Sequence, residues 1–276
     1  MRGIILPLLA AFVTTTLARR LNFFKRPTFP RPPIFFSHVL MVFAIYLGFL
    51  VVLSFFLQLA LNKFYAPLLP PAAVFMYAQF FIVAVMLITL LLYLRTDANK
   101  PFQAAFKNPE SKTSRLYDIG LGAVVYFVAF PWTMALNELC DALLRIIFHF
   151  ENYEQVAVRY LKQNLVSPLQ LITALLGIIV IAPIVEEILF RGTLQQYLKK
   201  YLSVRHAIFA TSCIFAMFHF SPSQGLGNLA IIPSLLVFAC FLGYTYERQG
   251  SLYASIGLHA TFNLATTLQI LLLKGT

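Results

Sequence analysis

Apolar residues fill long, nearly uninterrupted segments of this chain, and polar residues gather in the short stretches between them. Most of these segments are long enough to cross the roughly 30 Å hydrocarbon core of a bilayer as helices that rise about 1.5 Å per residue. They cover residues 3–18, 35–61, 72–94, 117–142, 168–190, 204–220, 228–246 and 251–273. The pattern predicts an all-α polytopic membrane protein with about eight transmembrane helices, or seven if the first lies in the interface.

Composition supports this class of protein. Of the 276 residues, 60% are hydrophobic and only 11% are charged, whereas soluble domains have about 25% charged residues. The three cysteines (Cys140, Cys213 and Cys240) lie within or beside apolar segments and form no CxxC pair. Their odd number and spacing make a disulfide framework or a thiolate metal site improbable. Residues 1–34 read as an apolar helix with a basic, proline-rich connector, and residues 35–276 as the transmembrane helical domain.

The net charge of +11 bears on topology. Most Lys and Arg residues fall in the connections after the first, third, fifth and seventh segments, the fifth being 191–205, and basic loops stay on the cytoplasmic side. We therefore expect both termini outside. A signal peptide at 3–18 is disfavoured, because Arg19 and Arg20 would have to be translocated directly behind it. Membrane lipid is an expected partner, and nucleic acid is not. Residues 144–166 are expected to form an interfacial helix on the outer side.

Two adjacent carboxylates, Glu186 and Glu187, lie inside the fifth apolar segment. An ionisable group near the centre of a bilayer costs about 2.5–3.5 kcal/mol even on a lenient scale. Arg191 follows Glu187 at the i+4 position, so an ion pair between them is locally easy, while Glu186 has no such local cation. This asymmetry predicts a supporting role for Glu187 with Arg191 and a chemical role for Glu186.

Three more polar residues lie in the later apolar segments: His219, His259 and Asn263. His259 and Asn263 are four residues apart and share one helix face. A further group in the fourth segment, which comprises Asn137, Glu138 and Asp141, reads as a solvated interfacial cluster.

A carboxylate with two imidazoles and an amide can carry out hydrolysis by activated water. A Glu in a poorly solvated pocket can act as the general base, a neutral His can orient the same water, and a second His with an Asn amide can donate to a developing oxyanion. If a divalent metal such as zinc binds instead, Glu186, His219 and His259 would hold it. The chain has no HExxH helix and Asn is a poor zinc ligand, so metal-free chemistry is slightly favoured and no metal site is assigned.

These motifs resemble a known family. Glu186-Glu187-x-x-x-Arg191, Phe215-x-x-x-His219 and His259-x-x-x-Asn263 are similar to the signature of the CPBP (CAAX protease and bacteriocin-processing, also called Abi) intramembrane endopeptidases, which include the type II CAAX prenyl endopeptidases. The resemblance implies a motif core at about 168–273 and a cavity open to the cytoplasmic side and to lipid. It also implies a peptide or lipidated-protein substrate. By the resemblance, Glu186 and His219 would activate the hydrolytic water, His259 and Asn263 would form the oxyanion site, and Glu187 with Arg191 would support the first motif. Gly192 fits the prokaryotic form of that motif, which implies a prokaryotic plasma membrane as the location. The family has been described both as metalloproteases and as metal-independent glutamic proteases.

Two other functions use the same residues. A membrane transporter or proton relay could employ the Glu and His set, although no second copy of the Glu-Glu motif is present, and an inactive immunity or scaffold protein would not need them. The natural substrate and the oligomeric state do not follow from the sequence. One geometric difficulty arises: simple spans put Glu186 near the cytoplasmic end of its helix and His219 near the outer end of its own. We therefore expect the helix of Glu186 to extend through residues 192–203, which would bring Glu186 deeper.

Overall fold

The computed structural model describes residues 2–25, 27–30, 32–64, 71–96, 100–149, 156–163 and 168–273. Over these residues the protein is helical and contains no β-strand, which confirms the all-α prediction. The helices of its first half are α1 (Arg2–Arg20), α2 (Phe36–Leu47), α3 (Ser54–Phe64), α4 (Pro71–Arg95), α5 (Lys100–Phe106) and α6 (Arg115–Phe148). Those of its second half are α7 (Val156–Gln163), α8 (Pro168–Leu176), α9 (Ala182–Glu187), α10 (Gln196–Leu198), α11 (Val204–Met217), α12 (Asn228–Gln249) and α13 (Leu252–Leu273).

Six of the described helical stretches are long and apolar enough to cross a membrane. They cover Gly3–Arg20, Phe36–Leu57, Met76–Arg95, Arg115–Phe148, Pro168–Leu198 and Pro222–Gln249. The expected segment 204–220 forms a helix of only 14 residues, α11, which is shorter than the roughly 20 residues that a span needs. The last segment forms the 22-residue helix α13, whose apolar sequence is interrupted by His259 and Asn263.

The expected interfacial helix at 144–166 is wrong in its first part. Residues 144–148 belong to α6, which ends where His149 adopts a left-handed conformation with φ of 50°. A separate short helix, α7, then covers Val156–Gln163. Residues 150–155 and 164–167 lie outside the described part of the chain.

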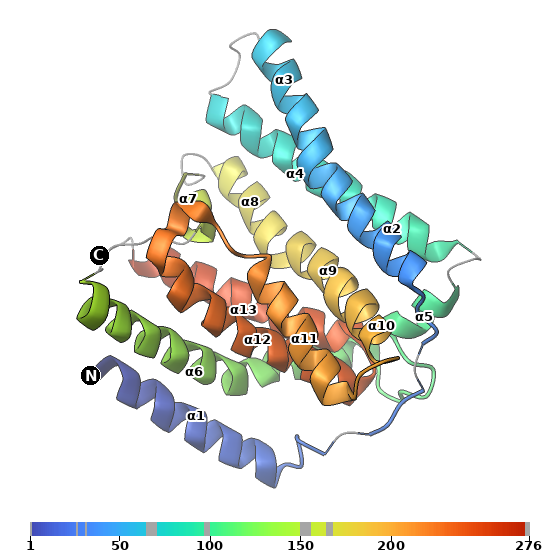
Figure 1. Ribbon diagram of the computed structural model, residues 1–276, viewed down its shortest axis with the longest axis vertical. Helices are drawn as coiled ribbons and strands as arrows, with labels where there is room; N and C mark the ends of the chain where they lie inside the picture. The colour runs from blue at the N-terminus through green and yellow to red at the C-terminus, as the bar shows by residue number, and fades with distance from the viewer. Residues whose placement is uncertain are drawn as a thin grey trace.

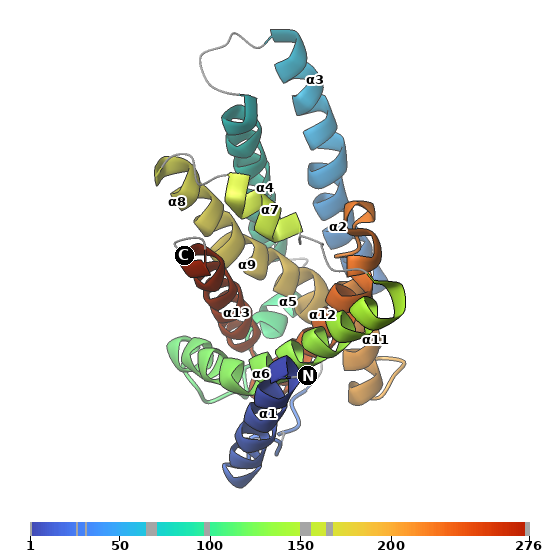
Figure 2. The ribbon, with the colours of Figure 1, turned by 90° about the vertical axis from the view of Figure 1, so that its left-hand side faces the viewer.

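The π-helical segment Gly48–Leu53 joins α2 and α3 into one long helix. Figure 1 shows this helix beside α4 on one side of the molecule, with α1 and α6 side by side on the opposite side. Between them run α8, α9 and α10, and Figure 2 shows α7 lying close to α8. Helices α6 and α13 meet closely at two glycines. A Cβ atom on Gly122 would collide with the carbonyl oxygen of Ala254, and one on Gly257 would collide with that of Ile119. Small residues at such crossings let membrane helices approach to backbone contact.

The helix that carries the two glutamates is continuous from Pro168 to Leu198. It is α-helical at its centre, in α9, and π-helical on both sides, at Gly177–Ile181 and Ile188–Gln195. The expected extension beyond Arg191 is therefore confirmed as far as Leu198, after which the chain turns. Ser203 is the N-cap of α11: its Oγ accepts a hydrogen bond from the backbone N–H of His206.

This hairpin resolves the expected mismatch in depth between Glu186 and His219. Glu186 lies 12 residues before Leu198, about 18 Å along the helix, and His219 follows a returning helix of similar length, about 20 Å. Because α11 returns only part of the way across, the two side chains reach the same level.

Candidate active site

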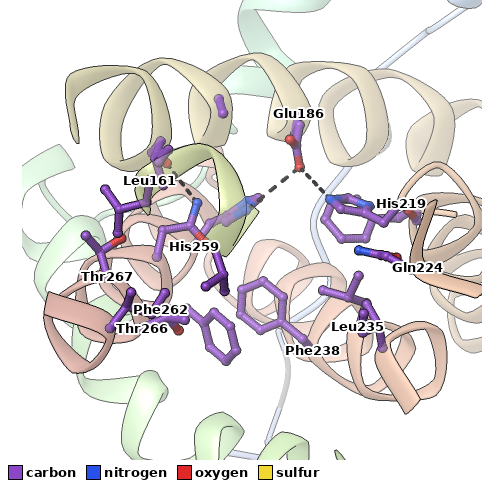
Figure 3. A pocket seen from close by; sticks show the side chains of 17 residues that line it. Leu161, Glu186, His219, Gln224, Leu235, Phe238, His259, Phe262, Thr266 and Thr267 are labelled. Carbon is purple, nitrogen blue, oxygen red and sulfur yellow. Dashed lines mark hydrogen bonds and ion pairs between the residues drawn. The ribbon is translucent and has the colours of Figure 1, made fainter. Parts of the chain in front are cut away.

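Three segments bring Glu186, His219 and His259 together. Glu186 lies on α9, His219 directly after α11, and His259 on α13. Glu186 Oε2 lies 3.9 Å from Nε2 of His219 and 3.8 Å from Nε2 of His259. Figure 3 shows the carboxylate pointing between the two imidazole rings. Both separations exceed a direct hydrogen bond, and a water molecule is the group that commonly bridges polar atoms at such distances.

Each imidazole ring is oriented by a partner on its other nitrogen. His219 Nδ1 lies 2.9 Å from the carbonyl oxygen of Phe215, and His259 Nδ1 lies 2.9 Å from Oε1 of Glu187. Both partners are acceptors, so each Nδ1 carries the proton and donates it. In the neutral rings the Nε2 lone pairs therefore face Glu186, whose own Oε2 is buried without a hydrogen-bond partner among the described residues.

Glu187 holds Arg191 and His259 in position beside Glu186. Its Oε1 accepts a hydrogen bond from Nη1 of Arg191 at 3.0 Å, and both side chains are fully buried. The expected ion pair is therefore present. Arg191 also donates from Nη2 to the carbonyl oxygen of Ala239 at 3.1 Å, and its guanidinium lies 4.5 Å from the ring centroid of Phe215. A buried charge pair with these extra contacts ties α9, α11, α12 and α13 together around Glu186.

The buried position of Arg191 contradicts one part of the topology prediction. Arg191 was expected to contribute to the basic connection 191–205, but it is a buried helix residue with a carboxylate partner. Two other basic residues of the same side, Lys107 and Lys199, form ion pairs with Asp118 and Glu247. Loop charge on that side is therefore smaller than the sequence indicated.

A cavity of about 280 Å³ lies against the three residues. Its wall beside His219 is made of aromatic and aliphatic side chains, and its opposite part follows one face of α13. The lining residues are Val158, Leu161, Ile178, Ala182, Glu186, Phe215, His219, Gln224, Ile231, Leu235, Phe238, His259, Phe262, Asn263, Thr266, Thr267 and Ile270. A mostly apolar cavity with a few convergent polar groups is the usual form of a ligand site.

Asn263 also lines this cavity, and its side chain serves a second purpose. Its Nδ2 donates to the carbonyl oxygen of Ile178 at 2.8 Å. In the π-helical segment, the N–H of Ala182 bonds to the carbonyl of Gly177, five residues back. The next donor in that register would be the nitrogen of Pro183, which has no hydrogen. Asn263 thus supplies the donor that Pro183 lacks, and one amide hydrogen remains for the cavity.

The cavity extends away from the hairpin between α10 and α11. On the helix of Glu186 the lining reaches Ile178, and on the neighbouring α13 it reaches Ile270 at the same end of the cavity. Two residues of α7, Val158 and Leu161, cover that end. The basic residues of the connection 191–205 led us to expect this hairpin on the cytoplasmic side. On that expectation the lining runs towards the outer side, which is opposite to the predicted cytoplasmic opening.

Glu186 lies too far from the two histidines to share a zinc ion with them. Two ligands of a tetrahedral zinc ion with bonds of about 2.05 Å lie about 3.3 Å apart, which is shorter than the separations from Glu186 to either histidine. Across the described residues, no group of three or more His, Cys, Asp or Glu side chains is arranged to hold a metal ion. The side chains as placed therefore do not fit a zinc site.

One polar group predicted from the sequence lies outside the cavity, and one polar residue inside the cavity was not predicted. Asn137, Glu138 and Asp141 lie on α6, do not line the cavity and are half-buried, with Asn137 Nδ2 donating to Asp141 Oδ2 at 2.9 Å. Gln224 was not predicted as a site residue. It lies in the turn after His219 and lines the cavity. In the sequence, the one indication of its role is that it is a polar residue shortly after His219.

Comparison with known proteins bears on the same region. Residues 168–265 match the model of a family described as type II CAAX prenyl endopeptidase Rce1-like, in agreement with the resemblance seen in the motifs. The match contains all six of the expected site residues. Comparisons with curated proteins and with solved structures gave no significant match.

Proposed function

We propose that this integral membrane protein is an endopeptidase that cleaves a peptide bond within the membrane by means of water activated by Glu186 and His219. The match of residues 168–265 to a CAAX-type endopeptidase family supports the general class. The observation that carries the mechanism is the position of Glu186 Oε2, buried and unpartnered between two imidazole nitrogens at 3.8 and 3.9 Å.

The proposed reaction starts with a water molecule held between Glu186 and His219. Glu186 accepts one proton as the water oxygen attacks the carbonyl carbon of the scissile peptide bond. The carbonyl π electrons move to oxygen and form a tetrahedral oxyanion. Glu186 then delivers its proton to the amide nitrogen, the C–N bond breaks, and an amine and a carboxylic acid leave.

Asn263 and His259 would stabilise the oxyanion. Asn263 has one amide hydrogen beyond the one it gives to Ile178. His259 can donate from Nε2 only when its ring is doubly protonated, and the carboxylate of Glu187 at its Nδ1 would compensate that charge. Preorganised donors of this kind contribute about 10²–10³-fold in rate. No step is routed through a metal, because the side chains as placed do not fit one.

The substrate class follows from the walls of the cavity. Phe215, Phe238 and Phe262 present aromatic surface beside the reacting groups, which suits apolar side chains near the scissile bond. We therefore propose a membrane-associated peptide or a lipidated protein as the substrate. Prenylated CAAX proteins and bacterial peptides, including those of bacteriocin processing or immunity, are the two narrower candidates. The sequence predicts entry from the cytoplasmic face, and the direction of the cavity lining agrees with this prediction only if the hairpin between α10 and α11 lies on the outer side.

The test is cleavage of a lipid-anchored peptide reporter by purified protein in liposomes. Glu186→Gln should lower the rate by about 10²–10⁴-fold, as expected for loss of a general base. Its folding should not suffer, because Oε2 of Glu186 accepts no hydrogen bond from any of the described residues. Glu138→Gln is a matched control, since that carboxyl lies on α6 outside the cavity. Full activity of Glu186→Gln would rule out the glutamate-base mechanism.

The rival function, proton-coupled transport, has its own measurement. Solute uptake into proteoliposomes that depends on a proton gradient and stops in Glu186→Gln, with no cleavage of any reporter, would favour it. An inactive immunity or scaffold protein would keep its phenotype in cells when Glu186, His219 and His259 are all replaced.

A further inference from the structure

Gln224 is a buried polar side chain beside the reacting groups that the proposed mechanism does not use. It is 6% exposed, and its Oε1 is fully buried without a hydrogen-bond partner among the described residues. Figure 3 shows its side chain extending into the cavity next to His219. An unpaired buried carbonyl-type oxygen is unfavourable, so its presence in a ligand-sized cavity requires an explanation.

The turn that carries Gln224 is held in place by Asn228. The side-chain amide of Asn228 donates to the carbonyl oxygens of Ser221 at 2.8 Å and Gly225 at 2.9 Å, and its Oδ1 accepts from the N–H of Ser221 at 3.1 Å. Gly225 has φ of 52° and ψ of −129°, a conformation that only glycine adopts readily. Gln224 is therefore positioned by a preorganised turn and not by contacts of its own amide group.

The catalytic side chains at this end of the cavity offer hydrogen-bond acceptors to a substrate. With their Nδ1 protons engaged, the neutral rings of His219 and His259 offer acceptors at Nε2, and the carboxylate of Glu186 offers an acceptor as well. A peptide substrate must satisfy both a carbonyl and an N–H there. Gln224 is the lining residue near His219 whose side chain combines an NH₂ donor with a carbonyl acceptor.

We propose that Gln224 is a substrate-binding residue that pairs its carboxamide with one backbone peptide group of the substrate next to the scissile bond. Oε1 would accept the substrate N–H, and Nε2 would donate to the substrate carbonyl. This proposal rests on the proposed peptidase function, and it assigns to the turn Pro222–Gly227 the task of holding the substrate backbone in register with Glu186.

The test combines a variant with a backbone change in the substrate. Gln224→Leu removes both hydrogen-bonding atoms with little change in size. We expect KM for the lipid-anchored reporter to rise about tenfold with kcat little changed, since binding in the ground and transition states is lost equally. The thermal midpoint should stay the same or rise, because an unpaired buried polar group is removed. Ser223→Ala, an exposed position in the same turn, is the matched control.

Reporters in which one peptide N–H is replaced by an ester oxygen then locate the contact. At one position, the ester should raise KM for the unaltered protein but not for Gln224→Leu. A lower thermal midpoint with unchanged KM, or no coupling at any position, would overturn the proposal while cleavage by the unaltered protein leaves the peptidase function intact.

Binding of a photoreactive version of the reporter to Glu186→Gln decides the matter if no cleavage occurs at all. About tenfold weaker labelling of the double variant with Gln224→Leu would support peptide binding by Gln224 although the peptidase proposal had failed. Equal labelling, or none in either protein, would overturn both.

Discussion

The carboxylate of Glu187 lies 2.9 Å from Nδ1 of His259, a residue 72 positions further along the chain. The same oxygen accepts a hydrogen bond from Arg191 at 3.0 Å. One buried carboxylate thereby sets the tautomer of an imidazole ring and compensates a fully buried guanidinium. Glu186, its neighbour in sequence, lines the cavity and faces Nε2 of the same ring at 3.8 Å.

Replacing Glu187 by Ala should lower the free energy of unfolding. Arg191 would be left buried without its paired carboxylate, and breaking such a pair costs about 3–5 kcal/mol. Denaturation in detergent measures the loss, and Arg205→Ala, an exposed position, should change stability by less than about 0.5 kcal/mol. The double variant Glu187→Met, Arg191→Met should recover most of the stability but not the activity, since His259 loses its orienting partner. Recovered activity would show that Glu187 has no part in positioning His259.

Asn263→Leu separates a packing role from an oxyanion role. Loss of the hydrogen bond to Ile178 should cost about 0.6–1.7 kcal/mol, the range for interhelical bonds in membranes. If Asn263 also contacts the oxyanion, the rate per folded molecule should fall about 10²–10³-fold. Thr261→Val on the same helix, whose hydroxyl bonds only within α13 among the described residues, is the control. A stability loss with undiminished rate would limit Asn263 to completing the π-helical segment.

Chelation tests the metal-free mechanism. We expect cleavage to continue unchanged after dialysis against a strong chelator, with no stoichiometric zinc in the active protein by elemental analysis. The reason is that the separations from Glu186 to the two histidines are too long for shared zinc ligands as placed. Activity that disappears on chelation and returns with zinc would require His219 and His259 to move inward around a metal.

Cysteine labelling tests the side from which the cavity opens. In a variant without the natural cysteines, Thr266→Cys in the cavity and Tyr201→Cys on the hairpin should react with a membrane-impermeant thiol reagent from opposite sides of oriented vesicles. The lining from Glu186 to Ile270 runs away from the hairpin, which explains the expectation. Labelling of both from the same side would mean that water enters at the level of His219. Whole-cell labelling of Tyr201→Cys then shows on which side the hairpin lies. Reaction with intact cells would place the hairpin outside and the cavity opening at the cytoplasmic face, and no reaction would place the opening at the outer face.

Much of the architecture could be predicted because bilayers demand long apolar helices with internally satisfied backbones. The eight apolar segments all became helical, and helical spacing correctly indicated that Glu187 and Arg191 pair and that His259 and Asn263 share the cavity-facing side of α13. Spacing within one helix is a local property, so these relations needed no tertiary information.

Relations between helices were decided only by the tertiary structure. The hydropathy of residues 204–220 suggested a full span, yet α11 is short, and only its return beside α10 brings His219 level with Glu186. The bond from Asn263 to Ile178 depends on a π-helical register that Pro183 leaves incomplete, and Gln224 enters the cavity through a turn fixed by Asn228. Hydropathy and periodicity state which residues prefer lipid and which face they share. They contain no information about how far one helix is displaced along another, and that displacement sets the distances at this site.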